Sequence, residues 1–201
     1  MRPIAHLALV PVLLFVLLTG TSAQSPSPRD VKYYADLSTV RDDGAIRRLM
    51  RRQAETGDLR AMVDYAALLR NTSTFAPGED LRFHAEAERF DRVAAERGDP
   101  LAQVNMGVWC LRNQLIQVPP GVCRSDVDAV RWFRLAMDGG NATATAYYGY
   151  MVEFGRGGLT KDPKLAARYY AEAGRRGDFH GGRFLEDMEK YADRRPRGPN
   201  P

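Results

Sequence analysis

The fold is decided by residues 140–178, which read GNATATAYYGYMVEFGRGGLTKDPKLAARYYAEAGRRGD. The stretch opens with Gly140-Asn141 and closes with Gly177-Asp178. Glycine tolerates the left-handed backbone that ends a helix, and the polar residue after it accepts a hydrogen bond from the free amides of the next helix. In the middle, Asp162-Pro163 supplies an N-cap and a first helical position. The stretch therefore predicts two helices joined by a short glycine-rich turn.

The same glycine and Asp or Asn dipeptide recurs along the chain. The dipeptides are Gly57-Asp58, Gly98-Asp99, Gly140-Asn141 and Gly177-Asp178, and their glycines are 41, 42 and 37 residues apart. An alanine precedes the last three of these glycines by eleven residues (Ala87, Ala129 and Ala166) and another by four (Ala94, Ala136 and Ala173). Small residues at i and large apolar ones at i+4, such as Ala144 and Tyr148, share one helical face. Such two-helix units cannot bury that face alone and are expected to stack on one another.

These residues resemble the Sel1-like repeat family, which is related to the tetratricopeptide solenoids. The third unit carries the likeness best, with Ala144, Tyr148 and Gly149, then Gly155 to Asp162, then Ala166-Ala167 and Tyr169-Tyr170. The resemblance implies an all-α protein. Its architecture would be a right-handed α-solenoid of about three helix–turn–helix repeats, with a half-repeat and a capping helix at the ends.

The predicted organisation follows from this register. A repeat domain would cover residues 44–191, with repeats at about 58–98, 99–140 and 141–177 and a closing helix at 178–191. A leader at 24–43 precedes it, and residues 31–37 are expected to form a short helix. A Pro- and Arg-bearing tail, residues 192–201, follows and is expected to be disordered.

The first 23 residues are typical of a cleaved signal peptide. Arg2 gives a positive start, Leu7 to Leu18 is almost wholly apolar, and the small residues Thr21-Ser22-Ala23 suit a signal peptidase. The alternative is a retained anchor, but the apolar run is short of the roughly 20 residues that span a bilayer. We therefore predict a periplasmic or secreted protein without a transmembrane span after cleavage.

The two cysteines, Cys110 and Cys123, flank an enlarged loop. A nearby pair in an oxidising compartment predicts a disulfide, and two buried thiols are the alternative. Neither cysteine lies in a CxxC pair or near a histidine, so we predict no metal site.

Charge and motifs argue against two other classes of protein. The formal net charge is +4, and the basic residues alternate with acidic ones along the expected helices, which indicates solvated faces rather than nucleic-acid binding. Neither a GxSxG elbow nor a phosphate-binding GxxxxGK loop occurs, and the histidines of the expected mature chain, His84 and His180, do not form an HExxH pattern. We predict a protein that is not an enzyme and that needs no cofactor.

Partner binding is expected on the first helix of each repeat, which usually lines the concave face of a solenoid. The candidate contacts are Asp64, Leu68, Asn105, Trp109, Arg112, Tyr147 and Tyr150. Aromatic residues and arginine are enriched at binding hot spots. The alternative for Trp109 and Tyr150 is packing between repeats, and the enlarged loops 71–79 and 111–124 are a second candidate surface.

The leading functional prediction is an exported protein–protein interaction module, acting as an envelope scaffold or regulator. The first alternative is an immunity protein that neutralises a periplasm-acting toxin of type VI secretion, which an adjacent toxin gene would favour. A hydrolase resembling a β-lactamase is the third, although no serine of the expected mature chain is followed by lysine three residues on. The identity of the partner and the oligomeric state do not follow from the sequence.

Overall fold

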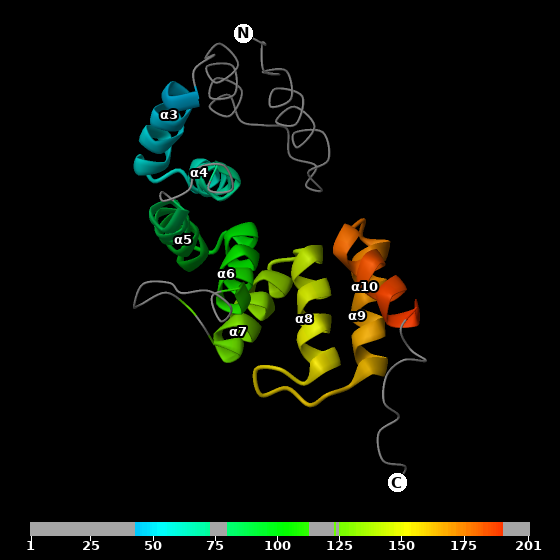
Figure 1. Cartoon of the computed structure of the whole chain (residues 1–201). Helices are drawn as coiled ribbons and strands as arrows, with labels where there is room; N and C mark the ends of the chain where they lie inside the picture. The colour runs from blue at the N-terminus through cyan, green and yellow to red at the C-terminus, as the bar shows by residue number, and fades with distance from the viewer. Residues whose placement is uncertain (1–42, 73–79, 113–122, 124, 191–201) are drawn as a thin grey trace. The chain divides into compact units, whose positions relative to one another are not determined.

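The computed structural model describes residues 43–72, 80–112, 123 and 125–190, and within these ranges all regular structure is helical, with no strand. The helices, labelled in Figure 1, are α3 (Asp43–Glu55), α4 (Leu59–Thr72), α5 (Asp80–Glu96), α6 (Pro100–Arg112), α7 (Asp126–Asp138), α8 (Ala142–Phe154), α9 (Pro163–Arg175) and α10 (Phe179–Lys190). Residues 1–50 and 51–201 form two compact units, and α3 runs across their boundary. The second unit holds α4 to α10 and with them all three predicted repeats.

Several predicted segments lie outside the described residues. They are the signal peptide (1–23), nearly all of the leader with its short helix, the centres of both enlarged loops, and the C-terminal tail (192–201). Among the helices that are described, none combines the length and the apolar character that crossing a bilayer requires.

The glycine dipeptides end one helix and start the next, as predicted. Gly57, Gly98, Gly140 and Gly177 have φ values of +90°, +93°, +82° and +83°, in the left-handed region that favours glycine. The side chain after each glycine accepts a hydrogen bond from the backbone amide three residues further on. These bonds are Asp58 with Ala61 (2.9 Å), Asp99 with Ala102 (2.8 Å), Asn141 with Ala144 (3.0 Å) and Asp178 with Gly181 (2.8 Å). Each cap satisfies an amide that the first helical turn would otherwise leave unpaired.

The helices pair into hairpins that stack in chain order. α4 packs with α5, α6 with α7, and α8 with α9, while α5 contacts α6 and α7 contacts α8 between successive hairpins. α10 packs against both α8 and α9, as the first helix of a further hairpin would (Figure 1). The chain is thus an all-α solenoid of helical hairpins, and the predicted fold class is confirmed.

Small residues let the helix axes within a hairpin come close together. A Cβ atom placed on Gly107 of α6 would lie 2.3 Å from the ring of Phe133 in α7, and one on Gly149 of α8 would lie 2.9 Å from Cβ of Tyr169 in α9. Phe133 itself is fully buried. The aromatic ring therefore occupies the space that the missing side chain leaves, which fixes how the two helices pack.

Candidate partner-binding surface

The predicted contacts of the first hairpin, Asp64 and Leu68, lie on α4. Both side chains are half-buried. Asp64 forms an ion pair with Arg60 one turn earlier, at 3.2 Å. Such i, i+4 pairs at a surface contribute only about 0.3–0.5 kcal/mol to stability. Their role in partner binding stays a prediction.

In the second hairpin, the predicted contacts Asn105 and Trp109 turn towards a buried carboxylate. Asn105 donates from Nδ2 to Oδ1 of Asp91 at 2.9 Å, and Trp109 donates from Nε1 to Oδ2 of Asp91 at 2.9 Å. Arg70 of α4 forms an ion pair with the same carboxylate. Asp91 is 0% exposed and Trp109 is 3% exposed. These three donors therefore connect α4, α5 and α6 through one acid.

Burial dominates the electrostatics of Asp91. Desolvation raises the pKa of Asp91 above its usual value, and it outweighs the opposing effects of the Arg70 charge and of the hydrogen bonds from Trp109, Asn105 and Arg70. His84 of α5 completes the cluster, with its ring 5.4 Å from that of Trp109 in an edge-on arrangement. The cluster is a buried polar network that holds the first two hairpins together.

The predicted disulfide between Cys110 and Cys123 is present, with Cα atoms 4.7 Å apart. It ties the segment before α7 to the buried side of α6, because Cys110 is 0% exposed. The amide of Cys123 donates to Oε1 of Glu88 at 3.4 Å, so α5 also contacts this segment. The side chain of Arg112, the remaining predicted contact on α6, lies outside the described residues.

In the third hairpin, the predicted contacts Tyr147 and Tyr150 belong to a row of aromatic rings shared by α8 and α10. Tyr150 lies 4.9 Å from Phe154 and 6.0 Å from Phe184, and His180 lies 5.9 Å from both Phe184 and Phe179 (centroid distances). We call Phe154, Tyr150, Phe184, His180 and Phe179 the aromatic strip. Its two ends are open to solvent, since Phe154 is 50% exposed and Phe179 is 73% exposed.

Tyr147 anchors the strip to the hairpin beneath it. Its ring stacks on Phe133 of α7, with centroids 5.2 Å apart and planes 9° apart, and it also contacts His180 at 5.3 Å and Phe184 at 5.8 Å. Tyr147 is half-buried, and its contacts connect the strip to α7.

Arg156, in the loop after α8, orients Tyr150. Its guanidinium donates to both carboxylate oxygens of Asp126 at 2.8 Å, a bidentate pair, and to the hydroxyl of Tyr150 at 3.4 Å. These contacts raise the pKa of Arg156, with the hydrogen bond to Asp126 as the main cause and burial opposing it. The strip is therefore held in place by packing on one side and by a fixed ion pair on the other.

Sequence reasoning missed four of the five residues of the strip, which come from α10 and the end of α8. Phe179, His180, Phe184 and Phe154 were not among the predicted contacts. A signal existed, because Phe179 and His180 follow the Gly177-Asp178 cap directly and Phe184 lies one turn beyond His180. Treating residues 179–190 as the first helix of another hairpin would have placed them beside Tyr147 and Tyr150.

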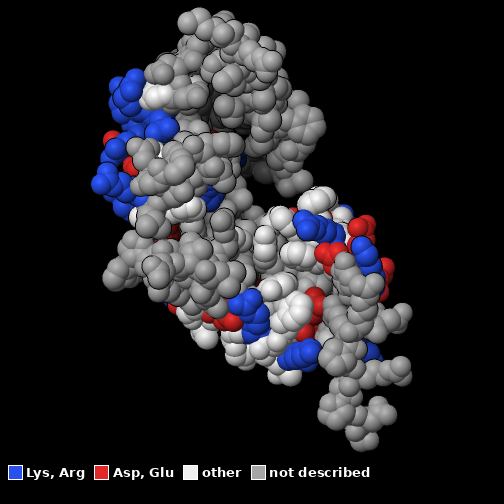
Figure 2. Space-filling model, in the orientation of Figure 1, with Lys and Arg blue, Asp and Glu red and all other residues white. Residues whose placement is uncertain are grey.

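The charges around the strip have no single sign. Figure 2 shows Lys and Arg side chains gathered over α3, whereas acidic and basic side chains are interspersed over α10. Within the described residues, no three His, Cys, Asp or Glu side chains gather as a metal site would require. What this surface offers a ligand is aromatic contact area rather than charge.

Two adjacent glycines of α10 test how the strip is assembled. A Cβ atom on Gly181 would lie 2.6 Å from Cβ of Ala173 and 2.7 Å from both the amide nitrogen of Gly174 and the carbonyl oxygen of Tyr170. Because backbone atoms cannot yield, we expect Gly181→Ala to displace α10 from α9 and to lower the free energy of unfolding by about 2 kcal/mol. Denaturant unfolding followed by circular dichroism measures this loss.

Gly182→Ala is the matched control, since a Cβ atom there would meet nothing within 4 Å. Removing a glycine from a helix interior is expected to stabilise by up to about 1 kcal/mol. Amide hydrogen exchange in α10 should rise in the first variant only. Equal stability of the two variants would show that α9 and α10 do not approach this closely.

Comparisons with known proteins agree with this architecture. The Sel1 repeat family matches residues 100–141 and 142–178, which contain the hairpins α6–α7 and α8–α9. A crystal structure of a Sel1 repeat protein from Oxalobacter formigenes is similar, with 27% identity and a TM-score of 0.50 over 69% of this chain and 95% of that one. No curated protein matches the sequence significantly.

A second solved structure shares the fold alone. It is a protective antigen present in uropathogenic Escherichia coli strains and displaying an SLR fold, with 23% identity and a TM-score of 0.60. The similarity covers 81% of this chain but only 32% of that longer one. The capped hairpins, the glycine contacts and these matches lead to one conclusion. The chain contains two Sel1 repeats, which are the hairpins α6–α7 and α8–α9.

Proposed function

We propose that this protein is an exported protein-binding module that holds its partner against the aromatic strip on α8 and α10. Sel1-repeat solenoids are typically interaction modules rather than enzymes. The observation that carries the proposal is the exposure of Phe154 and Phe179, at 50% and 73%, at the two ends of an otherwise packed row of rings. Large aromatic side chains left open to water mark surfaces that a partner covers.

The proposed export rests on two features of this chain. The expected signal peptide at residues 1–23 would direct the chain out of the cytosol, and the Cys110–Cys123 disulfide suits an oxidising compartment. Together they favour a role outside the cytosol, as a scaffold or regulator of an envelope protein complex.

The strip is tested by removing both exposed rings at once. Because these two rings are the most exposed of the strip and a partner would cover both, we expect Phe154→Ser with Phe179→Ser to weaken partner binding at least about 100-fold, which is about 2.7 kcal/mol. The partner is first recovered by cross-linking to the wild-type chain in envelope extract. Its affinity for the purified variant is then measured by titration calorimetry.

Val93→Ser is the matched control, because Val93 of α5 is an exposed apolar residue outside the strip, at 37% exposure. We expect this variant to keep the wild-type affinity. Unchanged binding by the double phenylalanine variant would remove the strip as the binding surface. If the recovered partner is a secreted toxin whose activity the wild-type chain abolishes, the immunity role replaces the scaffold role.

A further inference from the structure

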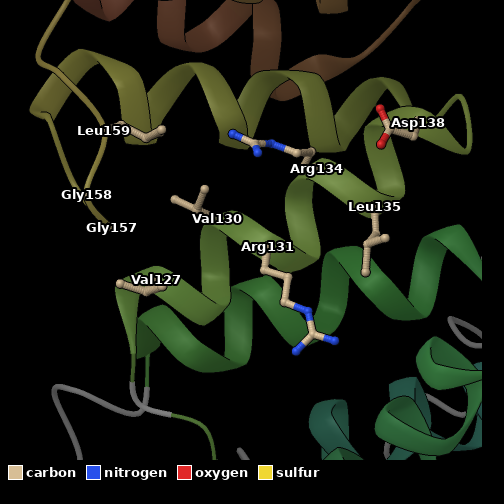
Figure 3. Close-up of a pocket in the computed structure, with 9 residues that line it drawn as sticks. All are labelled: Val127, Val130, Arg131, Arg134, Leu135, Asp138, Gly157, Gly158 and Leu159. Atoms are coloured by element: carbon tan, nitrogen blue, oxygen red, sulfur yellow. The ribbon is translucent and has the colours of Figure 1, made fainter.

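A groove of about 410 Å³ lies between α7 and the loop that joins α8 to α9 (Figure 3). Its apolar lining comes from Val127, Val130 and Leu135 of α7 and from Leu159 of the loop, and Arg131 and Arg134 of α7 add two guanidinium groups. None of these residues belongs to the aromatic strip. The groove is therefore a separate surface of the same repeat pair.

The apolar side chains of this groove are exposed where a helix normally presents polar residues. Val127 is 63% exposed and Leu135 is 41% exposed. They share one face of α7 with Arg131, because residues four apart in a helix lie above one another. Water contact with two large apolar groups on a single face is unfavourable, which indicates that something covers them.

The glycine-rich loop keeps the groove open. The loop packs directly on α7, since a Cβ atom on Gly157 would lie 2.5 Å from the carbonyl oxygen of Asp126 and 2.6 Å from Cγ2 of Val130. On Gly158, whose φ is +81°, a Cβ atom would meet nothing within 4 Å. The loop opposite α7 therefore lines the groove with two glycines and one larger side chain, Leu159 (Figure 3).

Two arginines and one carboxylate, Asp138, line the groove, so its net charge is positive. Arg134 donates to the hydroxyl of Tyr148 at 3.1 Å, and Arg131 lies over the ring of Trp132 at 5.8 Å. The pKa of Arg134 is raised, chiefly by its hydrogen bond to Tyr148 and to a smaller extent by the charge of Asp138, which lines one end of the groove. A ligand with carboxylates would complement this arrangement.

The length of the groove distinguishes a peptide from a small acid. Residues 127 to 138 rise by about 16 Å along the helix axis, at 1.5 Å per residue. An extended chain covers that distance with about five residues. A small carboxylic acid would meet one arginine and leave most of the apolar surface in water.

We propose that this groove binds an extended acidic segment of a partner protein, about five residues long. Apolar side chains of that segment cover Val127, Leu135 and Leu159, and one or two of its carboxylates pair with Arg131 and Arg134. The inference goes beyond the role proposed for the strip, because it gives the protein a second docking surface of different chemistry. A module with both surfaces bridges two protein segments.

The test uses peptides as the probe. A phage-displayed library of random 12-residue peptides is selected on the purified, disulfide-bonded chain, and enriched peptides are synthesised with a fluorescent label for anisotropy titrations. We expect the enriched sequences to carry Asp or Glu between apolar residues. A version of each peptide with Lys in place of the acidic residues should bind the wild-type chain at least about tenfold more weakly.

Matched variants assign the binding to the groove. We expect Arg131→Glu with Arg134→Glu to weaken binding of the acidic peptides at least about tenfold and to strengthen binding of their lysine versions. Val127→Asp, at a 63% exposed position that the fold does not need, should weaken the acidic peptides in the same direction. Phe154→Ser with Phe179→Ser should leave the affinity for the acidic peptides unchanged, whether or not the strip binds a partner.

Three results would overturn the inference. The first is a selection that enriches no acidic pattern. The second is a set of acidic peptides that bind the double arginine variant and the Val127→Asp variant as tightly as the wild type, and the third is loss of peptide binding in the strip variant instead. Vesicles of anionic phospholipid serve as the last probe. If they bind through the same two arginines while the acidic peptides do not, the groove recognises a membrane surface and not a protein segment.

Discussion

Asp91→Ala is expected to lower the free energy of unfolding by about 4 kcal/mol, because it removes the acceptor of a buried network. Nε1 of Trp109 in a buried site and Nδ2 of Asn105 in a half-buried one would each lose their hydrogen-bond partner, at about 1–3 kcal/mol apiece. The ion pair with Arg70 would be lost as well. Urea unfolding followed by circular dichroism measures the difference.

Asp64→Ala is the control for this prediction, because it makes the same chemical change at a surface ion pair. Asp64 is half-buried and bonds to Arg60 within one helix, so its loss is expected to cost less than about 0.5 kcal/mol. Similar losses in the two variants would show that the network around Asp91 does not hold the hairpins together.

The pH dependence gives the same network a second readout. Burial raises the pKa of Asp91 above its usual 3.8, so the folded chain keeps the proton to a higher pH than the unfolded chain does. This contribution to stability is complete below pH 3.8 and is lost as pH rises through the raised pKa. The stability of the wild type relative to Asp91→Asn should therefore fall over that range. A rise would mean that Arg70 outweighs burial.

Replacing both cysteines, Cys110→Ser with Cys123→Ser, is the other change with a large expected effect, about 3 kcal/mol. The bridge joins residues 13 apart, and the chain-entropy model gives about that stabilisation for a loop of this size. Reduction of the wild-type chain should shift its denaturant midpoint to that of the double variant, and the variant itself should not respond to reductant.

The same bridge reports on the compartment of the protein. We expect both thiols to resist alkylation in intact cells until a reductant is added, because an exported chain meets oxidising conditions. Two thiols that react at once in cells would contradict the proposed export. A midpoint unchanged by reduction would instead show that the bridge adds nothing to stability.

Sequence alone was enough for the repeat architecture because its determinants are local. Gly98 and Asp99 end one helix and cap the next through contacts that span four residues, and the same pair recurs at near-constant spacing. The Cys110–Cys123 bridge could likewise be predicted from the sequence, since the two residues flank one loop. Each of these features depends on neighbours in the chain, which a single sequence displays.

The surface chemistry was decided by tertiary packing. Trp109 has the spacing of an exposed first-helix residue, yet it turns to Asp91 of the preceding helix and becomes buried. Tyr150 gains its neighbour Phe184 only because Gly181 lets α10 settle against α9.

The physical reason is that a stacked helix buries more than one of its faces. α8 contacts α7, α9 and α10, and most of its thirteen residues are apolar, so periodicity does not separate the side chains that pack from those that stay open. Local rules therefore determine where each helix of this protein begins and ends. Only the contacts between helices distant in sequence determine which of its side chains a partner can reach.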